Sequence, residues 1–266
     1  MVDPSPLVSI ITPTCDGQAF VRETIDSALS QTYEHIEVIV VDDGSRDETA
    51  AIASAIDDPR LKVIRLQSTS GHAARPRNIA TAASSGSLVA PLDHDDLAHP
   101  ERVARQVERF ARDPRLVLLG GQAIRIDVDG HELGPWTVPT GEKDVMSALR
   151  WRCPFIHSTT MFKRDAFDAV GGYDERAVLA QDHALWLRLA GIGRVDNLTD
   201  VLCSYRIHST QITQSKLMNG DDKAAISEAR LAMATGRGES VQMATLRQRV
   251  WVWRHAFRAF RRVLRS

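Results

Sequence analysis

The stretch Ser87-Leu-Val-Ala-Pro-Leu-Asp-His-Asp-Asp-Leu97 decides how the chain is interpreted. Its apolar first half is typical of a buried strand, and the strand ends in the carboxylates of Asp93, Asp95 and Asp96. In an open α/β sheet, ligands bind at the carboxyl ends of the strands. Carboxylates separated by one residue can present oxygens to a hard divalent cation such as Mg²⁺ or Mn²⁺. A solvated acidic turn after a strand is the alternative at this point.

The composition is that of an ordinary soluble protein. The chain has 266 residues, of which 43% are hydrophobic and 25% charged, enough for one large domain with a small appendage. A formal net charge of -1 gives no global sign of a nucleic-acid partner. Three scattered cysteines without a CxxC pattern favour a reducing compartment. Because neither a secretory signal nor a long apolar run is found, we expect a cytoplasmic protein.

Strand and helix patterns alternate over the first hundred residues. Strands are predicted at 7–12, 36–41, 61–66 and 87–92, and helices at 19–31, 47–56 and 74–83. This alternation predicts an α/β fold with a Rossmann-like, mostly parallel sheet and helices on both faces. The GxGxxG and GxxxxGK[ST] fingerprints are both missing. A nucleotide bound here would therefore be held by side chains and a metal rather than by a glycine loop.

The second part of the chain has an α+β pattern. Helices are predicted at 101–112, 164–170 and 182–190, and strands at 116–119, 122–126, 158–162 and 201–206. Residues 131–147 are expected to be irregular. Residues 221–266 are predicted to be helical and basic, with an apolar face formed by Val250, Trp253, Phe257, Phe260 and Leu264. This tail is either a helix packed on its own domain or an interfacial helix on anionic lipid at the inner face of a membrane.

Six motifs occur in order along the chain. They are Val8-Ser-Ile-Ile-Thr-Pro-Thr14, Gln31-Thr-Tyr33, Glu37-Val-Ile-Val-Val-Asp-Asp-Gly-Ser45, Arg77-Asn78, Leu92-Asp-His-Asp-Asp96 and Gln181-Asp182. Together they resemble a family 2 glycosyltransferase with the GT-A fold. The resemblance implies a GT-A domain over residues 1–220, with a nucleotide-sugar half up to about residue 100 and an acceptor half beyond it. The helical tail, residues 221–266, lies outside the resemblance.

The resemblance also implies an activity. Enzymes of this family move a sugar from a nucleoside diphosphate sugar, here UDP-linked, to a hydroxyl acceptor with inversion. A metal ion, Mn²⁺ or Mg²⁺, assists the departure of the diphosphate. The implied acceptor is a saccharide or a lipid-linked molecule in polysaccharide, O-antigen or glycolipid synthesis. The identities of the sugar and the acceptor, and the oligomeric state, are left open.

The acidic loop is expected to form the metal end of the donor site. Asp93 and Asp95 match the DxD motif of the family, which makes Asp95 the expected metal ligand, and Asp93 a ligand nearer the ribose. Asp96 would orient a ligating carboxylate. His208, in a segment that resembles the Arg-x-His segment of the family, is a candidate third metal ligand. A purely structural histidine is its alternative.

The nucleotide is expected beside the second predicted strand, which ends in Asp42 and Asp43. A carboxylate there can accept a hydrogen bond from uracil N3–H or from a ribose hydroxyl, while a turn or helix cap is the alternative for Asp43. Pro13 and Thr14 would form the wall near the base. Arg77 is expected to reach the diphosphate, with a surface arginine as the alternative.

Asp182 is the expected general base. It opens an apolar helix and matches the second residue of the Glu-Asp pair of the family. A helix-terminal acid favoured by the helix dipole is the alternative. The first residue of the pair is Gln181, which removes one charge but keeps a hydrogen-bonding group. Trp151 and His157 are expected near the acceptor.

Two other functions remain open from the sequence. A sugar nucleotidyltransferase shares a nucleotide-binding sheet and acidic metal sites, but it needs a basic glycine-rich loop after the first strand. The loop Pro13-Thr-Cys-Asp-Gly17 contains no Lys or Arg. An inactive nucleotide-sugar-binding module is the non-enzymatic alternative, and the retention of every acidic motif argues against it.

Overall fold

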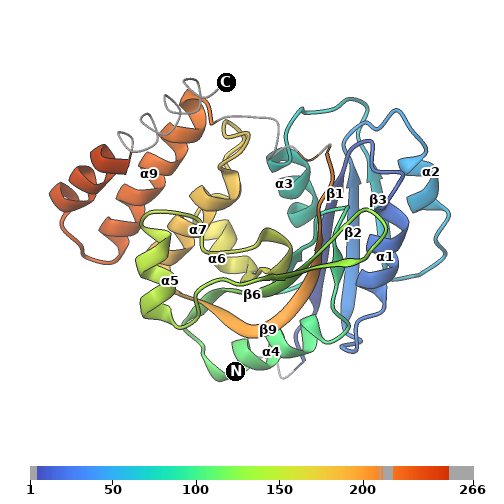
Figure 1. Cartoon of the computed structure of the whole chain (residues 1–266), viewed down its shortest axis with the longest axis horizontal. Coiled ribbons are helices and arrows are strands. Elements are labelled where there is room, and N and C mark those ends of the chain that lie inside the picture. Colours follow the sequence, from blue (N-terminus) through green and yellow to red (C-terminus); the bar gives the residue numbers. More distant parts are fainter. Residues whose placement is uncertain (1–4, 210, 212–217, 252–266) are drawn as a thin grey trace.

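The chain folds around one central sheet with helices on both faces (Figure 1). The computed structural model describes residues 5–209, 211 and 218–251. The strands are β1 (Val8–Thr14), β2 (Ile36–Asp42), β3 (Leu61–Arg65), β4 (Leu88–Pro91), β5 (Leu97–Ala98), β6 (Leu116–Ile126), β7 (Glu132–Trp136), β8 (Met161–Lys163) and β9 (Arg194–Arg206). The helices are α1 (Val21–Leu29), α2 (Thr49–Ser54), α3 (Ala74–Ala82), α4 (Arg102–Arg112), α5 (Glu142–Leu149), η1 (His157–Thr159), α6 (Arg164–Ala169), α7 (Gln181–Ile192) and α9 (Gly220–Gly236).

The sheet has the strand order β3-β2-β1-β4-β8-β6-β9-β5, and β7 pairs with β6. β1 lies between β2 and β4, and all three run parallel with β3. β8 runs antiparallel to both β4 and β6, so β6 points in the same direction as β4. The carboxyl ends of β1, β2, β4 and β6 therefore lie at one edge. The predicted α/β fold with a mostly parallel sheet is confirmed.

The sheet is buried on both faces because its central strands are apolar at successive positions. In β1 and β2, Ile11 and Ile39 pack into one core cluster, whereas Ile10 and Val38 pack into another. The first cluster includes residues of α3 and α7, and the second includes residues of α1 and α4. The uninterrupted apolar runs in the sequence therefore correspond to strands sandwiched between helices.

β6 is longer than the sequence suggests. The strands predicted at 116–119 and 122–126 are one continuous strand that passes through Gly120 and Gly121. A Cβ at Gly120 would lie 2.3 Å from Asn197 Oδ1, and one at Gly121 would lie 2.5 Å from Leu202 Cδ1. The two glycines are therefore points where neighbouring side chains approach the strand, and not a break between strands.

Two further segments differ from the expectation. The segment 131–147, expected to be irregular, contains β7 and α5. β7 includes Gly134 and Pro135 and is mostly exposed, so it has no alternating apolar pattern. β9 begins at Arg194 instead of residue 201, because its polar first half pairs with β6 despite lacking an apolar run.

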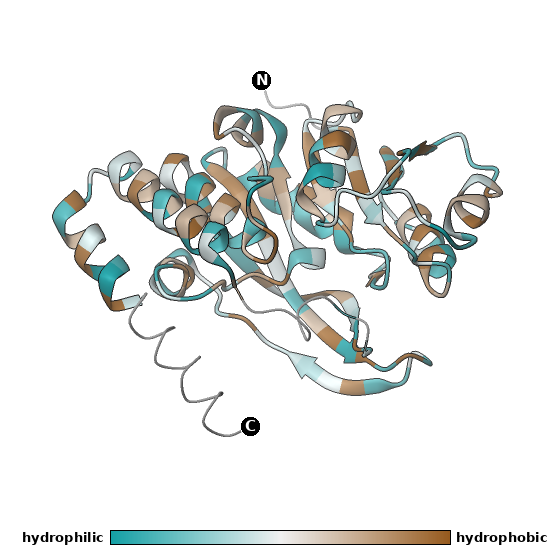
Figure 2. Ribbon diagram, turned by 90° about the horizontal axis from the view of Figure 1, so that it is seen from above, coloured by the Kyte–Doolittle hydropathy of each residue, from teal (hydrophilic) through white to brown (hydrophobic). Residues whose placement is uncertain are grey.

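The C-terminal helices pack on the domain. Ala225, Ile226, Ala229 and Met233 of α9 join the core cluster that contains α7. The helix over 241–251 lies at the outer side of α9 (Figure 2), and Trp251 Nε1 donates a hydrogen bond to Trp151 O. Residues 252–266, with most of the predicted apolar face of the tail, lie outside the described residues. None of the described helices combines the length and hydrophobicity needed to cross a membrane.

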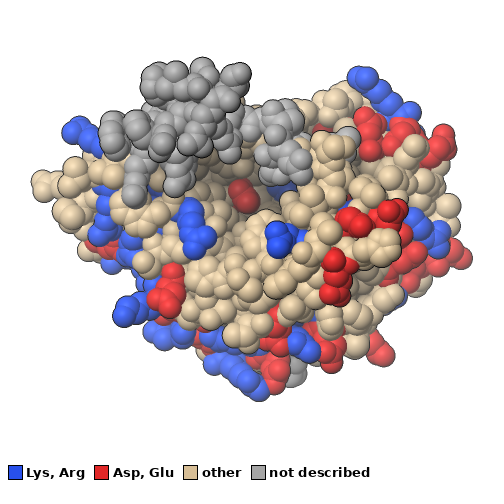
Figure 3. Space-filling view, viewed as in Figure 1, with Lys and Arg blue, Asp and Glu red and all other residues tan. Residues whose placement is uncertain are grey.

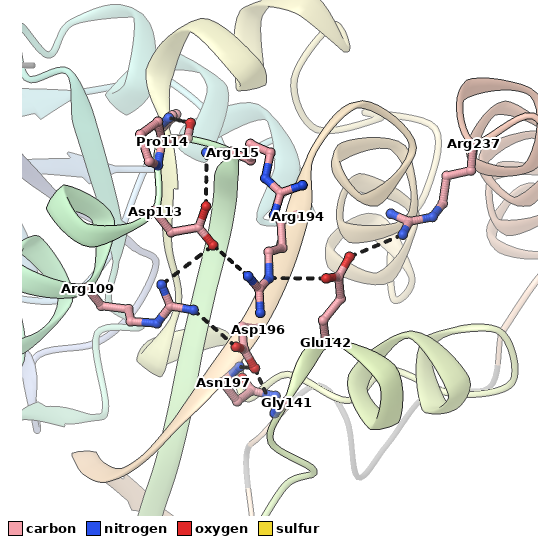
Figure 4. A network of polar contacts seen from close by, with 11 residues as sticks. Arg109, Asp113, Pro114, Arg115, Gly141, Glu142, Arg194, Asp196, Asn197 and Arg237 are labelled. Carbon is pink, nitrogen blue, oxygen red and sulfur yellow. Dashed lines mark hydrogen bonds and ion pairs between the residues drawn. The ribbon is translucent and has the colours of Figure 1, made fainter. Parts of the chain in front are cut away.

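Alternating charges connect these helices to the start of β9 (Figure 4). Arg194 contacts Asp113 at 2.9 Å through Nη1 and Glu142 at 3.1 Å through Nε. Glu142 also contacts Arg237 at 3.2 Å, and Arg237 donates to Ala190 O. The network borders a cavity of ≈ 620 Å³ at the starts of β6 and β9. This cavity therefore lies at the opposite end of the sheet from the carboxyl ends of the strands.

Arg102, the first residue of α4, is fully buried and supports the start of the acidic loop, the segment after β4 that contains Asp93, Asp95 and Asp96. Its Nη2 donates to Pro91 O and Thr160 O, both at 2.8 Å, and its Nε donates to Gln106 at 3.3 Å. Burial lowers the pKa of Arg102 to about 10, so the side chain remains charged near neutral pH. The guanidinium thus joins the end of β4 to the residue that precedes β8.

We predict that Arg102→Met lowers the free energy of unfolding by about 3 kcal/mol, because two buried carbonyls lose their donor. Urea unfolding followed by circular dichroism measures the change. Arg112→Met, on the same helix but with a side chain that is 71% exposed, is the matched control and should cost less than about 0.5 kcal/mol. Equal losses in the two variants would contradict the role of Arg102.

Candidate active site

Charged side chains gather where β1, β2 and β4 end. Figure 3 shows a hollow in the middle of one face of the molecule, with acidic and basic atoms inside it and at its rim. The loop that follows β4 enters this region from one side and the first turn of α7 from the other, and Arg77 of α3 contacts both. The sheet thereby brings together segments that are about 90 residues apart in the sequence.

Asp42 lies at the end of β2, next to Thr14 in the strand register. The Asp42 side chain is fully buried, and its Oδ1 accepts hydrogen bonds from the backbone N–H and the hydroxyl of Ser45. Its Oδ2 lies 3.5 Å from Arg65 Nε and accepts no hydrogen bond from any described residue. Pro13 and Thr14 are buried beside it, and the Thr14 hydroxyl also has no partner there. Buried polar groups of this kind need a partner, so this end of β1 and β2 suits a polar ligand.

Asp43 holds the loop after β3. Its Oδ2 accepts from Thr69 Oγ1 at 3.0 Å, Ser70 N at 2.9 Å and Ser70 Oγ at 2.8 Å. Gly44 has φ +73°, and a Cβ there would lie 2.7 Å from the backbone of Ser68. The Asp-Asp-Gly sequence therefore allows a close approach of two loops, and one oxygen of Asp43 is committed to it. The other, Oδ1, is buried without a hydrogen bond from the described residues.

Arg77 is buried, which makes the surface alternative wrong. Its Nη2 lies 2.6 Å from Asp93 Oδ1, and its guanidinium lies 5.6 Å from the centre of the Tyr173 ring. His157 Nδ1 approaches the same oxygen of Asp93 at 3.4 Å. Burial alone would raise the pKa of the Asp93 carboxyl, but Arg77 and His157 outweigh it and hold this pKa well below its usual range. Asp93 is therefore ionised and fixed in direction.

Gln181 connects Arg77 to the start of α7. In the amide orientation that satisfies both of its ends, Gln181 accepts from Arg77 Nη1 at 2.9 Å and donates to the carbonyls of Ala177 and Val178, both at 2.8 Å. A glutamine can make all three contacts, whereas an ionised glutamate has no proton to donate to the carbonyls. The departure from the Glu-Asp pair of the family thus has a local structural explanation.

Asp182 lies in the first turn of α7 and is partly exposed. Its Oδ1 accepts from His183 N at 2.6 Å, and His183 Nε2 lies 3.2 Å from Leu149 O. Burial acts to lower the pKa of Arg77, but the nearby charges of Asp93 and Asp182 keep that pKa above its ordinary value. Asp182 therefore adds to the negative charge around the Arg77 guanidinium.

Asp95 and His208 face each other, with Asp95 Oδ2 2.9 Å from His208 Nε2. Both side chains are largely buried, at 14% and 11% exposure. A carboxylate oxygen next to an imidazole nitrogen suits Mn²⁺ better than Mg²⁺, and such ions often take their other ligands from substrate phosphates and water. The residues present therefore fit a divalent cation. Asp93, the remaining predicted ligand, points instead to Arg77 and His157.

A second acidic group lies at the exposed turn between β6 and β7. Asp127, Asp129 and His131 bring potential ligand atoms within 4.8 Å of one another. Asp127 Oδ1 already accepts from the backbone N–H of Asp129 and of His131, both at 2.9 Å. These bonds are those of a hairpin turn, and they account for the cluster without an ion.

Asp96 is a fully buried support of the loop. Its Oδ1 accepts from Arg206 N at 2.9 Å, and its backbone carbonyl accepts from Thr24 Oγ1 at 2.9 Å. Burial raises the pKa of Asp96 well above its usual range, and the neighbouring Asp95 and Asp93 raise it further. Its position agrees with the expectation that it orients the neighbouring carboxylates.

Arg206 is the supporting residue that sequence reasoning missed. It is 2% exposed and donates to Asp95 O at 3.0 Å and to Val128 O at 2.9 Å. It also pairs with Glu23 at 2.8 Å and lies 4.6 Å from the centre of the Phe20 ring. Its sequence signal is its place in the segment that resembles Arg-x-His, in which the histidine is the residue type that binds metals.

Tyr173 was also missed, because it follows a Gly-Gly turn and belongs to no motif. His157 Nε2 lies 3.2 Å from the Tyr173 hydroxyl, and the other ring nitrogen of His157 faces Asp93. Tyr173 therefore helps to orient the imidazole that supports Asp93. Asn78 exchanges two hydrogen bonds with the Tyr173 backbone and braces a loop. Trp151, predicted near the acceptor with His157, is 38% exposed.

Comparison with known proteins identifies the family of the chain. Residues 9–171 match the family described as glycosyl transferase family 2. An uncharacterized glycosyltransferase of Rickettsia prowazekii (strain Madrid E) is 33% identical over 218 residues, which cover 80% of this chain and 68% of that protein.

Two solved structures share the fold. S. aureus TarS 1-349, solved in complex with UDP-GlcNAc, has a TM-score of 0.71 at 20% identity, covering 93% of this chain and 72% of that one. The mannosyltransferase PcManGT from Pyrobaculum calidifontis, in complex with GDP-Man and Mn²⁺, has a TM-score of 0.61 at 20% identity, covering 96% of this chain and 86% of that one. With its mostly parallel sheet and a match over more than half of its length, this chain belongs to glycosyl transferase family 2 and is a glycosyltransferase of the GT-A type.

Proposed function

We propose that this enzyme transfers a sugar from a nucleoside diphosphate sugar to a hydroxyl acceptor, with inversion at the anomeric carbon. The observation that carries the proposal is the position of Arg77, which bonds both Asp93 and Gln181. Through these two contacts, Arg77 brings the acidic loop after β4 close to Asp182, the neighbour of Gln181. A donor phosphate near Asp95 and an acceptor hydroxyl near Asp182 can then lie within one site.

The proposed donor is UDP-linked. Asp42 Oδ2 is a buried acceptor without a hydrogen bond from the described residues, and a uracil N3–H or a ribose hydroxyl would supply the missing donor. Pro13 and Thr14 border the same end of β1. Asp93 lies between this region and Asp95, and we assign it to the ribose and diphosphate. In this arrangement the nucleotide crosses the ends of β2, β1 and β4 in that order.

The proposed chemistry is a single displacement. The acceptor oxygen attacks the anomeric carbon as the bond from that carbon to the diphosphate oxygen breaks, and the acceptor proton passes to Asp182. A Mn²⁺ or Mg²⁺ ion held by Asp95 and His208 would neutralise the charge that develops on the diphosphate. Arg77 keeps Asp93 ionised and holds the start of α7 in place through Gln181.

Asp95→Ala is predicted to abolish metal-dependent donor binding. For the wild-type protein, UDP-sugars at about 100 times Kd should add about 2.7 kcal/mol to the free energy of unfolding when Mn²⁺ is present. A thermal-shift screen of nucleotide sugars with Mn²⁺ or with EDTA measures this. Asp129→Ala, which removes an acid from the exposed hairpin turn, is the control and should keep the shift. Retention of the shift in Asp95→Ala, or its loss in Asp129→Ala, would contradict the assignment.

Asp182→Asn should separate binding from transfer. The amide keeps the size of the side chain but cannot accept a proton, so we expect the same donor-induced thermal shift and a transfer rate lower by about 10²–10⁴-fold. Transfer is followed as product release with a panel of saccharide and lipid-linked acceptors. Normal turnover by Asp182→Asn would remove Asp182 as the base.

We also propose that the enzyme works in the cytoplasm at the inner face of a membrane, on an acceptor of polysaccharide, O-antigen or glycolipid synthesis. The helix over 241–251 leaves several apolar side chains exposed: Val241, Met243, Leu246 and Val250. The sequence continues with Trp253, Phe257 and further arginines. Apolar and basic residues together favour contact with anionic lipid.

Removal of residues 252–266 is predicted to abolish binding to anionic vesicles while leaving donor binding intact. The cut follows Trp251, which donates a hydrogen bond to the Trp151 carbonyl, so the described helices are kept. Flotation with phosphatidylglycerol-containing vesicles measures binding, and phosphatidylcholine vesicles serve as the uncharged control. Equal flotation of the full and shortened chains would refute the membrane proposal.

A further inference from the structure

Trp136, the last residue of β7, exposes an aromatic surface. Its side chain is 39% exposed, and its ring meets the Tyr205 ring edge-on, with centroids 4.8 Å apart. Its indole N–H makes no hydrogen bond to any residue that the structure describes. Tryptophan usually buries its ring and pairs its N–H, so a ring left open in this way suits a ligand.

The strand pairing places Trp136 beside the acidic loop. β9 runs along one edge of β6, and β8 occupies the other edge only at Leu118 and Leu119. Farther along β6, from Ala123 to Ile126, β7 pairs with the same edge in place of β8. Trp136 lies opposite Ala123 in this pairing. Because β8 lies between β6 and β4, β7 approaches the end of β4, where the acidic loop begins.

Trp136 also lies on the side of the sheet that carries the bracing histidine. Opposed residues of antiparallel strands point to the same face, so Trp136 shares a face with Ala123. Ala123 packs with Ile156, the residue before His157, and His157 contacts Asp93 at 3.4 Å. The indole is therefore a few side chains away from the proposed reacting centre.

Tyr205 connects the same surface to the proposed metal ligands. Gln211 Nε2 donates to the Tyr205 hydroxyl at 3.3 Å, and Gln211 Oε1 accepts from His208 N at 3.4 Å. His208 in turn faces Asp95. Trp136 thus adjoins the site from the side opposite to the proposed nucleotide pocket, since β1 and β4 separate β7 from Asp42.

We propose that Trp136, supported by Tyr205, is the surface on which a sugar ring of the acceptor stacks. The inference rests on the proposed function, in which a saccharide supplies the attacking hydroxyl. A pyranose has a flat face of C–H groups that fits an indole and hydroxyls that can accept from its N–H. The nucleotide base, which is also flat, belongs to the other end of the sheet. This makes the acceptor a saccharide or a lipid-linked saccharide, and not a bare lipid or a protein side chain.

Saturation-transfer NMR with glucose, galactose, mannose, N-acetylglucosamine and lactose, each at about 10 mM, tests this proposal on the full chain. We expect at least one of these sugars to bind the wild-type protein, and Trp136→Ala to weaken that binding by about fivefold. Trp136→Phe, which keeps a flat ring, should lose less than Trp136→Leu, which keeps only apolar bulk. No binding by the wild-type protein, or equal binding by Trp136→Ala, would overturn the proposal.

Leu133→Ala is the matched control, because Leu133 lies on the same strand, is 52% exposed and has no partner in the β6–β7 register. It should bind sugar as the wild type does, and a loss equal to that of Trp136→Ala would also overturn the stacking role.

The donor-induced thermal shift separates the stacking proposal from the proposed function. If the wild-type protein binds sugar through Trp136 but gives no shift with any nucleotide sugar, the proposed function fails and the stacking surface stands.

Discussion

The buried ion pair between Arg77 and Asp93 is the contact on which the rest of the site depends. Taking a carboxylate out of water is unfavourable unless a cation or hydrogen bonds compensate it. Arg77 supplies that cation, and because its other amino group bonds Gln181, the same guanidinium also positions α7. One buried side chain therefore fixes the relative positions of the acidic loop and Asp182. Without it, the carboxylates would repel one another with nothing between them.

Two more buried arginines complete this scaffold without entering the proposed chemistry. Arg102 holds the end of β4 from one side, and Arg206 holds the Asp95 carbonyl from the other. Both act mainly through backbone carbonyls, so they fix the loop without neutralising its carboxylates. The carboxylate of Asp95 instead faces His208. The site combines one arginine that balances charge with two that set geometry.

The sequence predicted those parts of the molecule that follow simple periodicity. The strands β1, β2 and β4 are mainly apolar and buried, and the parallel topology places Asp42 and Asp93 at one edge of the sheet. β7 and the first half of β9 were missed because their stability comes from pairing with β6 rather than from their own apolar pattern. Arg206 and Tyr173 were missed for a related reason. Their roles arise from contacts between segments distant in sequence, which no local pattern records.

The replacement of β8 by β7 along one edge of β6 has a consequence for specificity. The strands that carry the donor residues are parallel, buried on both faces and tightly constrained by the core. β7 is instead an exposed antiparallel strand that contains Gly134 and Pro135, so its sequence can change at little cost to the core. A side chain on β7 can therefore vary to match an acceptor while the donor end stays the same. With the proposed role of Trp136, that division assigns the choice of acceptor to the hairpin and the proposed chemistry to the sheet.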